Sequence, residues 1–104
     1  MTFVRVWRYT VAEAQREAFE RAYGPAGDWA QLFAKGGGYL GTELLGAADG
    51  GSQPTLAYVS IDRWRERSDW DAFLGDHDEE YRGLDRRLEN LTLEEENLRD
   101  WLSV

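Results

Sequence analysis

Two segments of the sequence carry rows of side chains that are suited to chemistry. In the strand predicted over 56–64, side chains alternate, so one face holds Leu56, Tyr58, Ser60, Asp62 and Trp64. The strand predicted over 3–9 repeats the division, with Phe3, Arg5, Trp7 and Tyr9 together. Mixed aromatic and polar groups suit a cavity wall better than a dry core. The opposite faces, with Val4, Val6, Ala57, Val59 and Ile61, are apolar and are predicted to lie under helices.

Other chemistry-bearing patterns in the chain have simpler structural explanations. The run Asp76–Glu80 cannot converge on a metal, because consecutive helical positions fan out around the axis, and no metal site is predicted. Gly36–Gly38 lacks the lysine and hydroxyl residue of a phosphate-binding loop. His77 is more often a hydrogen-bonded packing residue on such an apolar helical face, but we keep it as a candidate ligand contact.

A long helix is predicted to follow the strand over 56–64. Ser68 is a suitable N-cap residue, with Asp71 in the first turn. Gly75 and Asp76 favour a break in the helix, because glycine weakens a helix interior. One face is predicted to hold Trp70, Phe73, Leu74, His77, Tyr81, Leu84 and Leu88.

The first half of the chain contains two further predicted helices. Thr10–Glu13 fits a capping box that opens a helix, and Gly24–Pro25 ends that helix. Asp28 is expected to cap a short helix over 29–35.

The remaining predicted elements are strands and turns. A strand is predicted over 39–45, and the turn-forming residues 46–54 join it to the strand over 56–64 as a hairpin. Thr92–Glu95 fits a second capping box, which is expected to start a single turn. A fourth strand is expected over 97–104, with Leu98, Leu102 and Val104 facing inward.

This order of elements predicts an α+β, ferredoxin-like split βαβ sandwich in one domain over 1–104. Its four-stranded antiparallel sheet would have helices on one face and leave the other face bare. We expect the bare face to carry the aromatic residues, Phe3, Trp7, Tyr9, Tyr58 and Trp64. An exposed aromatic patch implies a partner, so the sequence predicts a homodimer through the sheet face around a shared cavity.

Charge and composition exclude several classes of function. The net charge is −8, which disfavours nucleic-acid backbones and anionic membrane surfaces as partners. The chain has no cysteine, which excludes disulfides and thiol chemistry. No apolar run approaches the length of a membrane span, and we expect a cytoplasmic protein.

Four segments resemble the antibiotic biosynthesis monooxygenase-like family of dimeric α+β barrels. They are Arg5–Arg8, Gly38–Leu45, Ser60–Trp64 and Ser68–Phe73. The resemblance covers nearly the whole chain and implies the fold and the dimer more strongly than an activity. The family includes cofactor-free oxygenases of phenolic polyketides and quinols, haem-degrading enzymes, and members without a known function.

The cofactor-free branch implies roles for the mixed strand faces, and it implies no cofactor. Such an enzyme binds a flat aromatic molecule, deprotonates it and stabilises the anion. Asp62 would accept the proton and Arg5 would stabilise the anion. The implied substrate contacts are Trp7, Tyr9, Tyr58, Trp64 and His77.

Other interpretations of the same residues remain open at this point. The haem-degrading branch fits poorly, because its strand-one asparagine is missing and its helix tryptophan and histidine positions fall at Phe73 and near Gly83. Arg5 could instead form a structural ion pair with Asp62 or Glu43, and Trp64 could be a packing anchor. The predicted function is a small cofactor-independent monooxygenase-like protein, and the alternative is a non-catalytic dimeric ligand-binding or interaction module.

Overall fold

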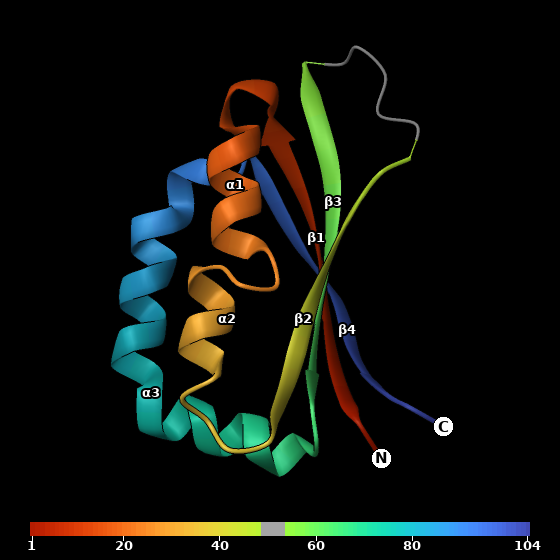
Figure 1. The fold of residues 1–104 in the computed structure, drawn as a ribbon, viewed down its shortest axis with the longest axis vertical. Coiled ribbons are helices and arrows are strands. Elements are labelled where there is room, and N and C mark those ends of the chain that lie inside the picture. The colour runs from red at the N-terminus through yellow and green to blue at the C-terminus, as the bar shows by residue number, and fades with distance from the viewer. Residues whose placement is uncertain (49–53) are drawn as a thin grey trace.

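A computed structural model describes residues 1–48 and 54–104, and its framework is a four-stranded antiparallel sheet (Figure 1). The strand order is β2-β3-β1-β4, so β1 and β3 lie in the centre of the sheet. The strands are β1 (Phe3–Ala12), β2 (Tyr39–Gly46), β3 (Thr55–Trp64) and β4 (Glu94–Leu102).

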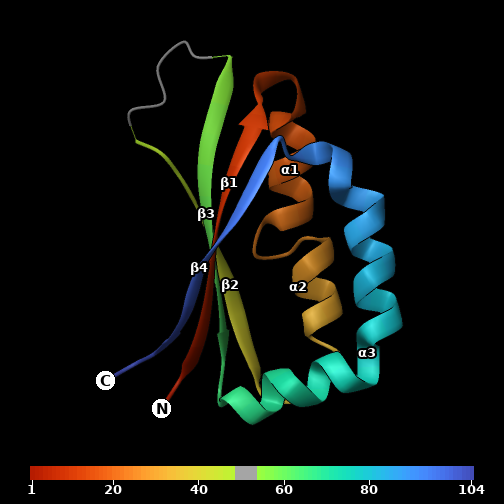
Figure 2. The same cartoon turned by 180° about the vertical axis from the view of Figure 1, so that it is seen from behind.

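Every α-helix of the described residues lies on the same face of this sheet, as Figures 1 and 2 show from opposite sides. They are α1 (Arg16–Tyr23), α2 (Asp28–Phe33) and α3 (Arg67–Leu88), with 3₁₀ turns over Glu13–Gln15 and Glu89–Leu91. Helices α1 and α2 connect β1 to β2, and α3 connects β3 to β4. This topology confirms the ferredoxin-like prediction. In the described part of the chain, no helix combines the length and apolarity needed to span a bilayer.

The two faces of the sheet have the opposite roles from those predicted: the aromatic face lies under the helices and the small apolar face is bare. The aromatic face packs under the helices, with Tyr9 and Tyr58 buried and Trp64 0% exposed. The prediction that these residues lie on the bare face was therefore wrong. The helices also turn aromatic rings inward, and rings from both layers pack together through their edges and faces. The rings within 6 Å of Trp64 are those of Phe33, Tyr39, Trp70 and Phe73.

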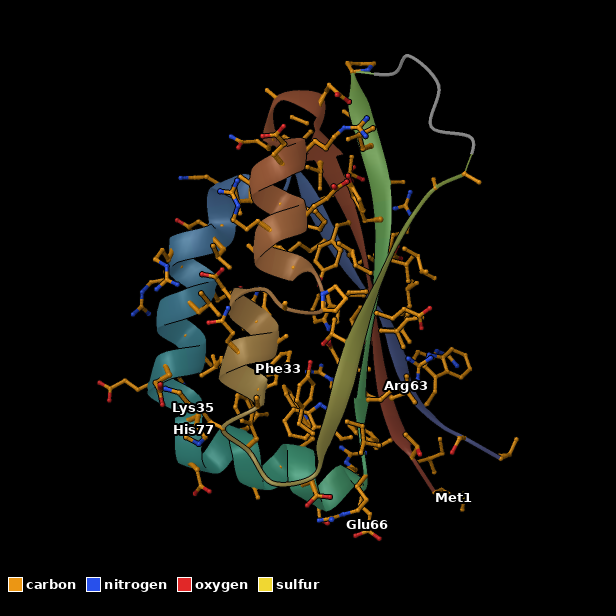
Figure 3. The ribbon with its side chains drawn as sticks, in the orientation of Figure 1. Met1, Phe33, Lys35, Arg63, Glu66 and His77 are labelled. Carbon is orange, nitrogen blue, oxygen red and sulfur yellow. The ribbon has the colours of Figure 1, made fainter. Side chains whose placement is uncertain are left out.

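The bare face of the sheet carries the smaller apolar residues that were expected under the helices. Val4 and Val6 on β1 and Val59 and Ile61 on β3 remain only half-buried in the single chain. In Figure 3, Arg63 projects from this side, away from the helices, and it pairs with Glu43 at 3.1 Å. An apolar strip with charged neighbours is therefore available to a partner.

Strand β1 is longer than predicted, so the first predicted capping box was wrong. Thr10 is not a helix cap, because it pairs with Ala57 on β3 and with Glu94 on β4. Pairing on both sides extends the strand to Ala12 and delays α1 until Arg16. The predicted stop is confirmed, because α1 ends at Tyr23 with Gly24 as its C-cap.

Helix α3 begins one residue before the predicted N-cap Ser68. Glu66 is the N-cap instead, and it forms a capping box with Asp69. The predicted break is confirmed close to its expected place, because His77 has φ −127° and ψ 26° inside the helix. As a result α3 is bent, and its two halves run in different directions (Figures 1 and 2). The short helix α2 begins at Asp28, one residue earlier than predicted.

The C-terminal strand also differs from its prediction. Thr92–Glu95 does not begin a helical turn, because β4 starts at Glu94. The pairing of β4 with β1 shifts between Arg5 and Trp7, and Arg99 next to this shift has φ +79°. The shift breaks the simple alternation on which the inward prediction for Leu98, Leu102 and Val104 depended. Leu98 is half-buried, whereas Leu102 is 54% exposed and Val104 is fully exposed.

The predicted pairing of β2 with β3 is confirmed, although residues 49–53 of the predicted connecting loop lie outside the described residues. Strand β2 contains a bulge near its start. Tyr39 pairs with Trp64 and Gly41 pairs with Arg63, so one extra residue of β2 lies between these pairs. The backbone of Gly41 has φ +136°, which strongly favours glycine.

We therefore expect Gly41→Ala to reduce the free energy of unfolding by roughly 1–3 kcal/mol, the cost of a strained backbone conformation. A methyl group at Gly41 would contact nothing within 4 Å, so the loss would come from the backbone alone. Urea denaturation measures the effect. Gly37→Ala is the matched control, because a methyl group there also meets nothing within 4 Å and Gly37 is outside the positive-φ region. Equal stability of the two variants would contradict the prediction.

Candidate active site

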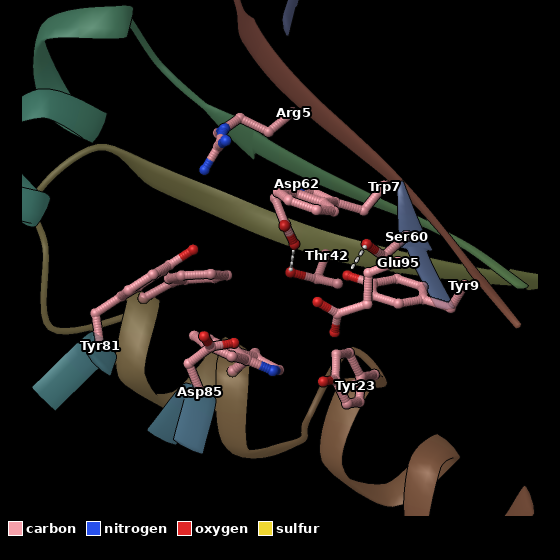
Figure 4. Close-up of a pocket in the computed structure, with 12 residues that line it drawn as sticks. Arg5, Trp7, Tyr9, Tyr23, Thr42, Ser60, Asp62, Tyr81, Asp85 and Glu95 are labelled. Carbon is pink, nitrogen blue, oxygen red and sulfur yellow. Dashed lines mark hydrogen bonds between the residues drawn. The ribbon is translucent and has the colours of Figure 1, made fainter. Parts of the chain in front are cut away.

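A cavity lies between the inner face of the sheet and the helices. It holds about 520 Å³ of empty space, including its open mouth. Its aromatic lining consists of Trp7, Tyr9, Tyr23, Trp29, Phe33 and Tyr81. Its polar lining consists of Arg5, Thr42, Ser60, Asp62, Asp85 and Glu95. Figure 4 shows side chains from the sheet and from the helices meeting around the same space.

Four of the residues predicted from the sequence line this cavity: Arg5, Trp7, Tyr9 and Asp62. All four come from the central strands β1 and β3. Arg5 and Asp62 are direct cross-strand neighbours in the β1–β3 pairing. The sheet therefore places a cation and a carboxyl group side by side on the cavity wall.

The other three predicted contacts lie outside the lining found in the described residues. Trp64 is fully buried in the core. Tyr58 donates a hydrogen bond from its hydroxyl to Glu20 at 2.5 Å. His77 lies at the bend of α3, where its Nδ1 is 2.8 Å from a carboxylate oxygen of Glu80. These contacts give all three side chains packing or surface roles in the free protein.

Arg5 is held by contacts on two sides. Its Nε donates to Oδ1 of Asp100 at 3.1 Å, and its guanidinium carbon lies 4.2 Å from the ring centroid of Trp70. An arginine stacked on an aromatic face and bound to a carboxylate has little freedom to move. The alternative in which Arg5 forms an ion pair with Asp62 or Glu43 is therefore wrong about the partner, which is Asp100, and the guanidinium still points into the cavity (Figure 4).

Asp62 accepts a hydrogen bond from the hydroxyl of Thr42, with 2.6 Å between Oγ1 and Oδ1. Burial raises the pKa of Asp62 to about 6, while Thr42 and the positive charge of Arg5 act in the opposite direction. A carboxyl group with a pKa near neutrality can accept a proton and release it again at physiological pH.

Two tyrosines of the lining are kept neutral by their surroundings. Burial raises the pKa of Tyr9 above its ordinary value, although a hydrogen bond with Ser60 at 3.1 Å opposes this. Burial raises the pKa of Tyr23 in the same way. Their hydroxyl groups can therefore make hydrogen bonds to a ligand without adding charge.

The other acidic residues of the lining are Asp85 on α3 and Glu95 on β4, and both are exposed. Burial of its carboxyl group and the nearby charge of Asp85 raise the pKa of Glu95. The sequence did not single out these two residues, because an exposed acidic residue that lines a cavity has the same local pattern as one on a solvated surface. Tyr81 was found only as a member of the apolar stripe of α3. Thr42 was missed although the strand over 39–45 was predicted.

The raised pKa of Asp62 predicts a specific pH dependence of stability. The unfolded state releases this proton near pH 3.8 and the folded state near pH 6, so the contribution of Asp62 to stability is greatest below pH 3.8 and is lost as the pH rises through about 6. The loss is at most about 3 kcal/mol. Asp62→Asn should therefore be more stable than the wild type at pH 7 and similar to it at pH 3.5. Denaturation at both pH values measures this, and a difference that does not change with pH would refute it.

Among residues 1–48 and 54–104, no three histidine, aspartate or glutamate side chains gather as metal ligands would.

Comparisons with known proteins identify the fold. The sequence matches no protein-family model and no curated protein. Among solved structures, a variant of the cofactor-independent oxygenase SnoaB from Streptomyces nogalater aligns with a TM-score of 0.75 and 24% identity, over 98% of this chain and 92% of that chain. A putative antibiotic biosynthesis monooxygenase from Nitrosomonas europaea aligns with a TM-score of 0.69 and 18% identity, over 99% of this chain and 90% of that chain.

The monooxygenase ActVA-Orf6 of Streptomyces coelicolor, solved with the ligand nanaomycin D, aligns with a TM-score of 0.66 and 20% identity, over 98% of this chain and 87% of that chain. Identities this low describe the shape of the chain and leave the chemistry of its own residues to be argued separately. The resemblance predicted from the sequence is confirmed at this level: the chain has the ferredoxin-like fold of the antibiotic biosynthesis monooxygenase proteins.

Proposed function

We propose that the protein is a small cofactor-independent oxygenase that binds a planar aromatic or quinol-type molecule in the cavity between sheet and helices. The observation that carries this proposal is the pairing of Asp62 with Arg5 on the wall of an aromatic cavity. Flat rings stack well on aromatic side chains, and the two charged groups supply a base and an anion-stabilising cation. The oxygenases that share the fold support the proposal.

In the proposed reaction, a substrate CH₂ group that is conjugated with a ketone carbonyl of the same ring system, as in an anthrone, is oxidised to a carbonyl. Asp62 accepts a proton from this carbon, and Arg5 stabilises the enolate oxygen that results. The anion gives one electron to O₂, and the two radicals combine into a carbon–oxygen bond. Asp62 returns its proton to the peroxide, and loss of water leaves the carbonyl. The substrate supplies four electrons, and the two oxygen atoms of O₂ end in the product and in water.

Oxygen uptake by metal-free protein is the direct test. Anthrones, naphthoquinols and phenols would be supplied in turn, and an oxygen electrode would record the rate. The proposal expects at least one substrate to be consumed with one O₂ per molecule, and the rate to fall in a variant of Asp62. If no member of the panel is oxidised while some members bind, the second candidate takes its place.

That second candidate is a non-catalytic ligand-binding module on the same fold. The contacts of Arg5 favour this candidate. A guanidinium that is bound by Asp100 and stacked on Trp70 can serve a purely structural role. This candidate predicts ligand binding that is measurable by calorimetry without consumption of oxygen.

We also propose that two copies of the chain associate through the bare face of the sheet. The supporting observation is the half-buried strip of Val4, Val6, Val59 and Ile61, together with Trp101, which is 53% exposed. Sedimentation velocity should give the mass of a dimer, and Ile61→Asp in the strip should give the mass of a monomer. A wild-type monomer at all concentrations would contradict this proposal.

A further inference from the structure

Three side chains form a continuous hydrogen-bonded row on the inner face of the sheet. The hydroxyl oxygen of Tyr39 lies 2.5 Å from Oγ1 of Thr42. Oγ1 of Thr42 lies 2.6 Å from Oδ1 of Asp62. Figure 4 shows the second of these bonds at the edge of the cavity. The row therefore links the proposed base to a tyrosine that is only half-buried.

The bulge of β2 makes this row possible. In a regular strand, residues three positions apart point to opposite faces, so Tyr39 and Thr42 would be separated by the sheet. The extra residue between the pairs Tyr39–Trp64 and Gly41–Arg63 turns Tyr39 to the face of Thr42. Bulges commonly redirect a side chain in this way beside a functional site.

Threonine is suited to be the middle member, because its hydroxyl has one hydrogen to donate and can also accept. When Asp62 is ionised, Thr42 donates to the carboxylate and accepts from Tyr39. When Asp62 is protonated, the carboxyl group donates to Thr42, which in turn donates to Tyr39. Both protonation states of Asp62 therefore satisfy the row, and the two states differ in the direction of every bond.

We propose that Thr42 and Tyr39 are positioning residues, which hold the carboxyl group of Asp62 at the cavity wall and adjust to its protonation by reversing their hydrogen bonds. The inference rests on the proposed function only in taking Asp62 as the base, because the row itself belongs to the free protein. Hydrogen bonds that polarise one another in series are stronger together than apart. The hydroxyl of Tyr39 is hydrogen-bonded to Thr42 and not to Asp62, so we expect the hydrogen-bonding effect of Tyr39 on Asp62 to pass through Thr42.

Other groups also face Asp62 and must be kept constant in a test. Arg5 from β1 opposes its protonation. Tyr9 from β1 and Tyr81 from α3 interact electrostatically with its charge. None of the substitutions proposed below removes any of these groups, so changes in the titration of Asp62 report on the row.

The titration of Asp62 can be followed directly in the full-length protein. Carboxyl-carbon NMR of aspartate-labelled protein reports its midpoint, and Asp62→Asn assigns the signal. Thr42→Val removes the donor to the carboxylate with little change in volume, so the midpoint should rise by about one pH unit. Thr42→Ser retains the hydroxyl and should restore the wild-type midpoint.

Tyr39→Phe keeps the ring that packs on Trp64 and removes only the hydroxyl. The midpoint of Asp62 should rise, by less than in Thr42→Val. In the Thr42→Val background, Tyr39→Phe should have no further effect, because the link is already broken. Tyr58→Phe is the control, since its hydroxyl bonds to Glu20 and its loss should leave the midpoint unchanged.

Two results would overturn the inference. One is a midpoint that does not change in Thr42→Val, and the other is an effect of Tyr39→Phe that is equal with and without Thr42. If Thr42→Val does not fold, Tyr39→Phe and Thr42→Ser still decide: an unchanged midpoint in Tyr39→Phe overturns the inference. None of these measurements needs turnover. If the protein consumes no oxygen but the single and double variants of Thr42 and Tyr39 shift the midpoint as expected, the proposed reaction is refuted and this inference stands.

Discussion

Replacement of Asp62 by asparagine should reduce the rate of oxygen consumption by a factor of roughly 10²–10⁴, the usual contribution of a general base. Asparagine has nearly the same shape and can still accept the hydrogen bond from Thr42, so the loss should come from the missing proton acceptor. The wild-type rate should also fall below a pH of about 6, because Asp62 is then protonated before substrate binds. An oxygen electrode and a pH series measure both effects.

Asp85→Asn is the matched control for this prediction. Asp85 lines the same cavity but is exposed, and it is not hydrogen-bonded to the row of Thr42 and Tyr39. Its substitution should change the rate by much less than the loss in Asp62→Asn. Full activity in Asp62→Asn, with the wild-type pH profile, would show that another group takes the proton.

Replacement of Arg5 by glutamine should reduce kcat by a factor of roughly 10²–10³, as expected when a preorganised charge is removed from a developing anion. The effect should appear more in kcat than in KM, because the enolate exists after binding and the neutral substrate does not need the charge. Steady-state oxygen uptake at varied substrate concentrations separates the two constants.

Arg8→Gln is the control for Arg5, because Arg8 lies on the same strand and belongs to the opposite face of the sheet. Its guanidinium pairs with Glu96 at 4.0 Å, and both side chains are largely exposed. Surface pairs of this kind contribute little to stability. A rate loss in Arg8→Gln as large as that in Arg5→Gln would indicate general damage to the sheet and contradict the proposed role of Arg5.

The alternation of strand residues predicted which side chains share a face, but it could not predict which face lies under the helices. Tyr58 and Asp62 were grouped correctly with each other, and so were Val59 and Ile61. The apolar group was then expected inside, because hydrophobicity alone favours it. The structure buries the aromatic group, since the helices supply inward rings such as Phe33 that need large partners. The fit in volume between the sheet and the helices is a property of the two packed layers, so it cannot be read from the sequence of one strand or one helix alone.

The residues that signal the ends of helices were less reliable predictors than the periodicity of strands and helices, for a similar reason. Thr10 has the pattern of a helix cap, but strand pairing on both of its sides decides its conformation. The break in α3 was predictable, because glycine weakens the helix through its own backbone. The row from Tyr39 to Asp62 was not predictable, because it depends on one extra residue in β2 that alternation does not reveal.

The position of the cavity has a consequence for the stoichiometry of binding. Since one chain supplies both the sheet and the helices around the cavity, the proposed site would be complete within each chain. Calorimetric titration should therefore saturate at one ligand per chain. The saturation curve should be hyperbolic, with a Hill coefficient of about 1, because filling one site leaves the lining of another unchanged.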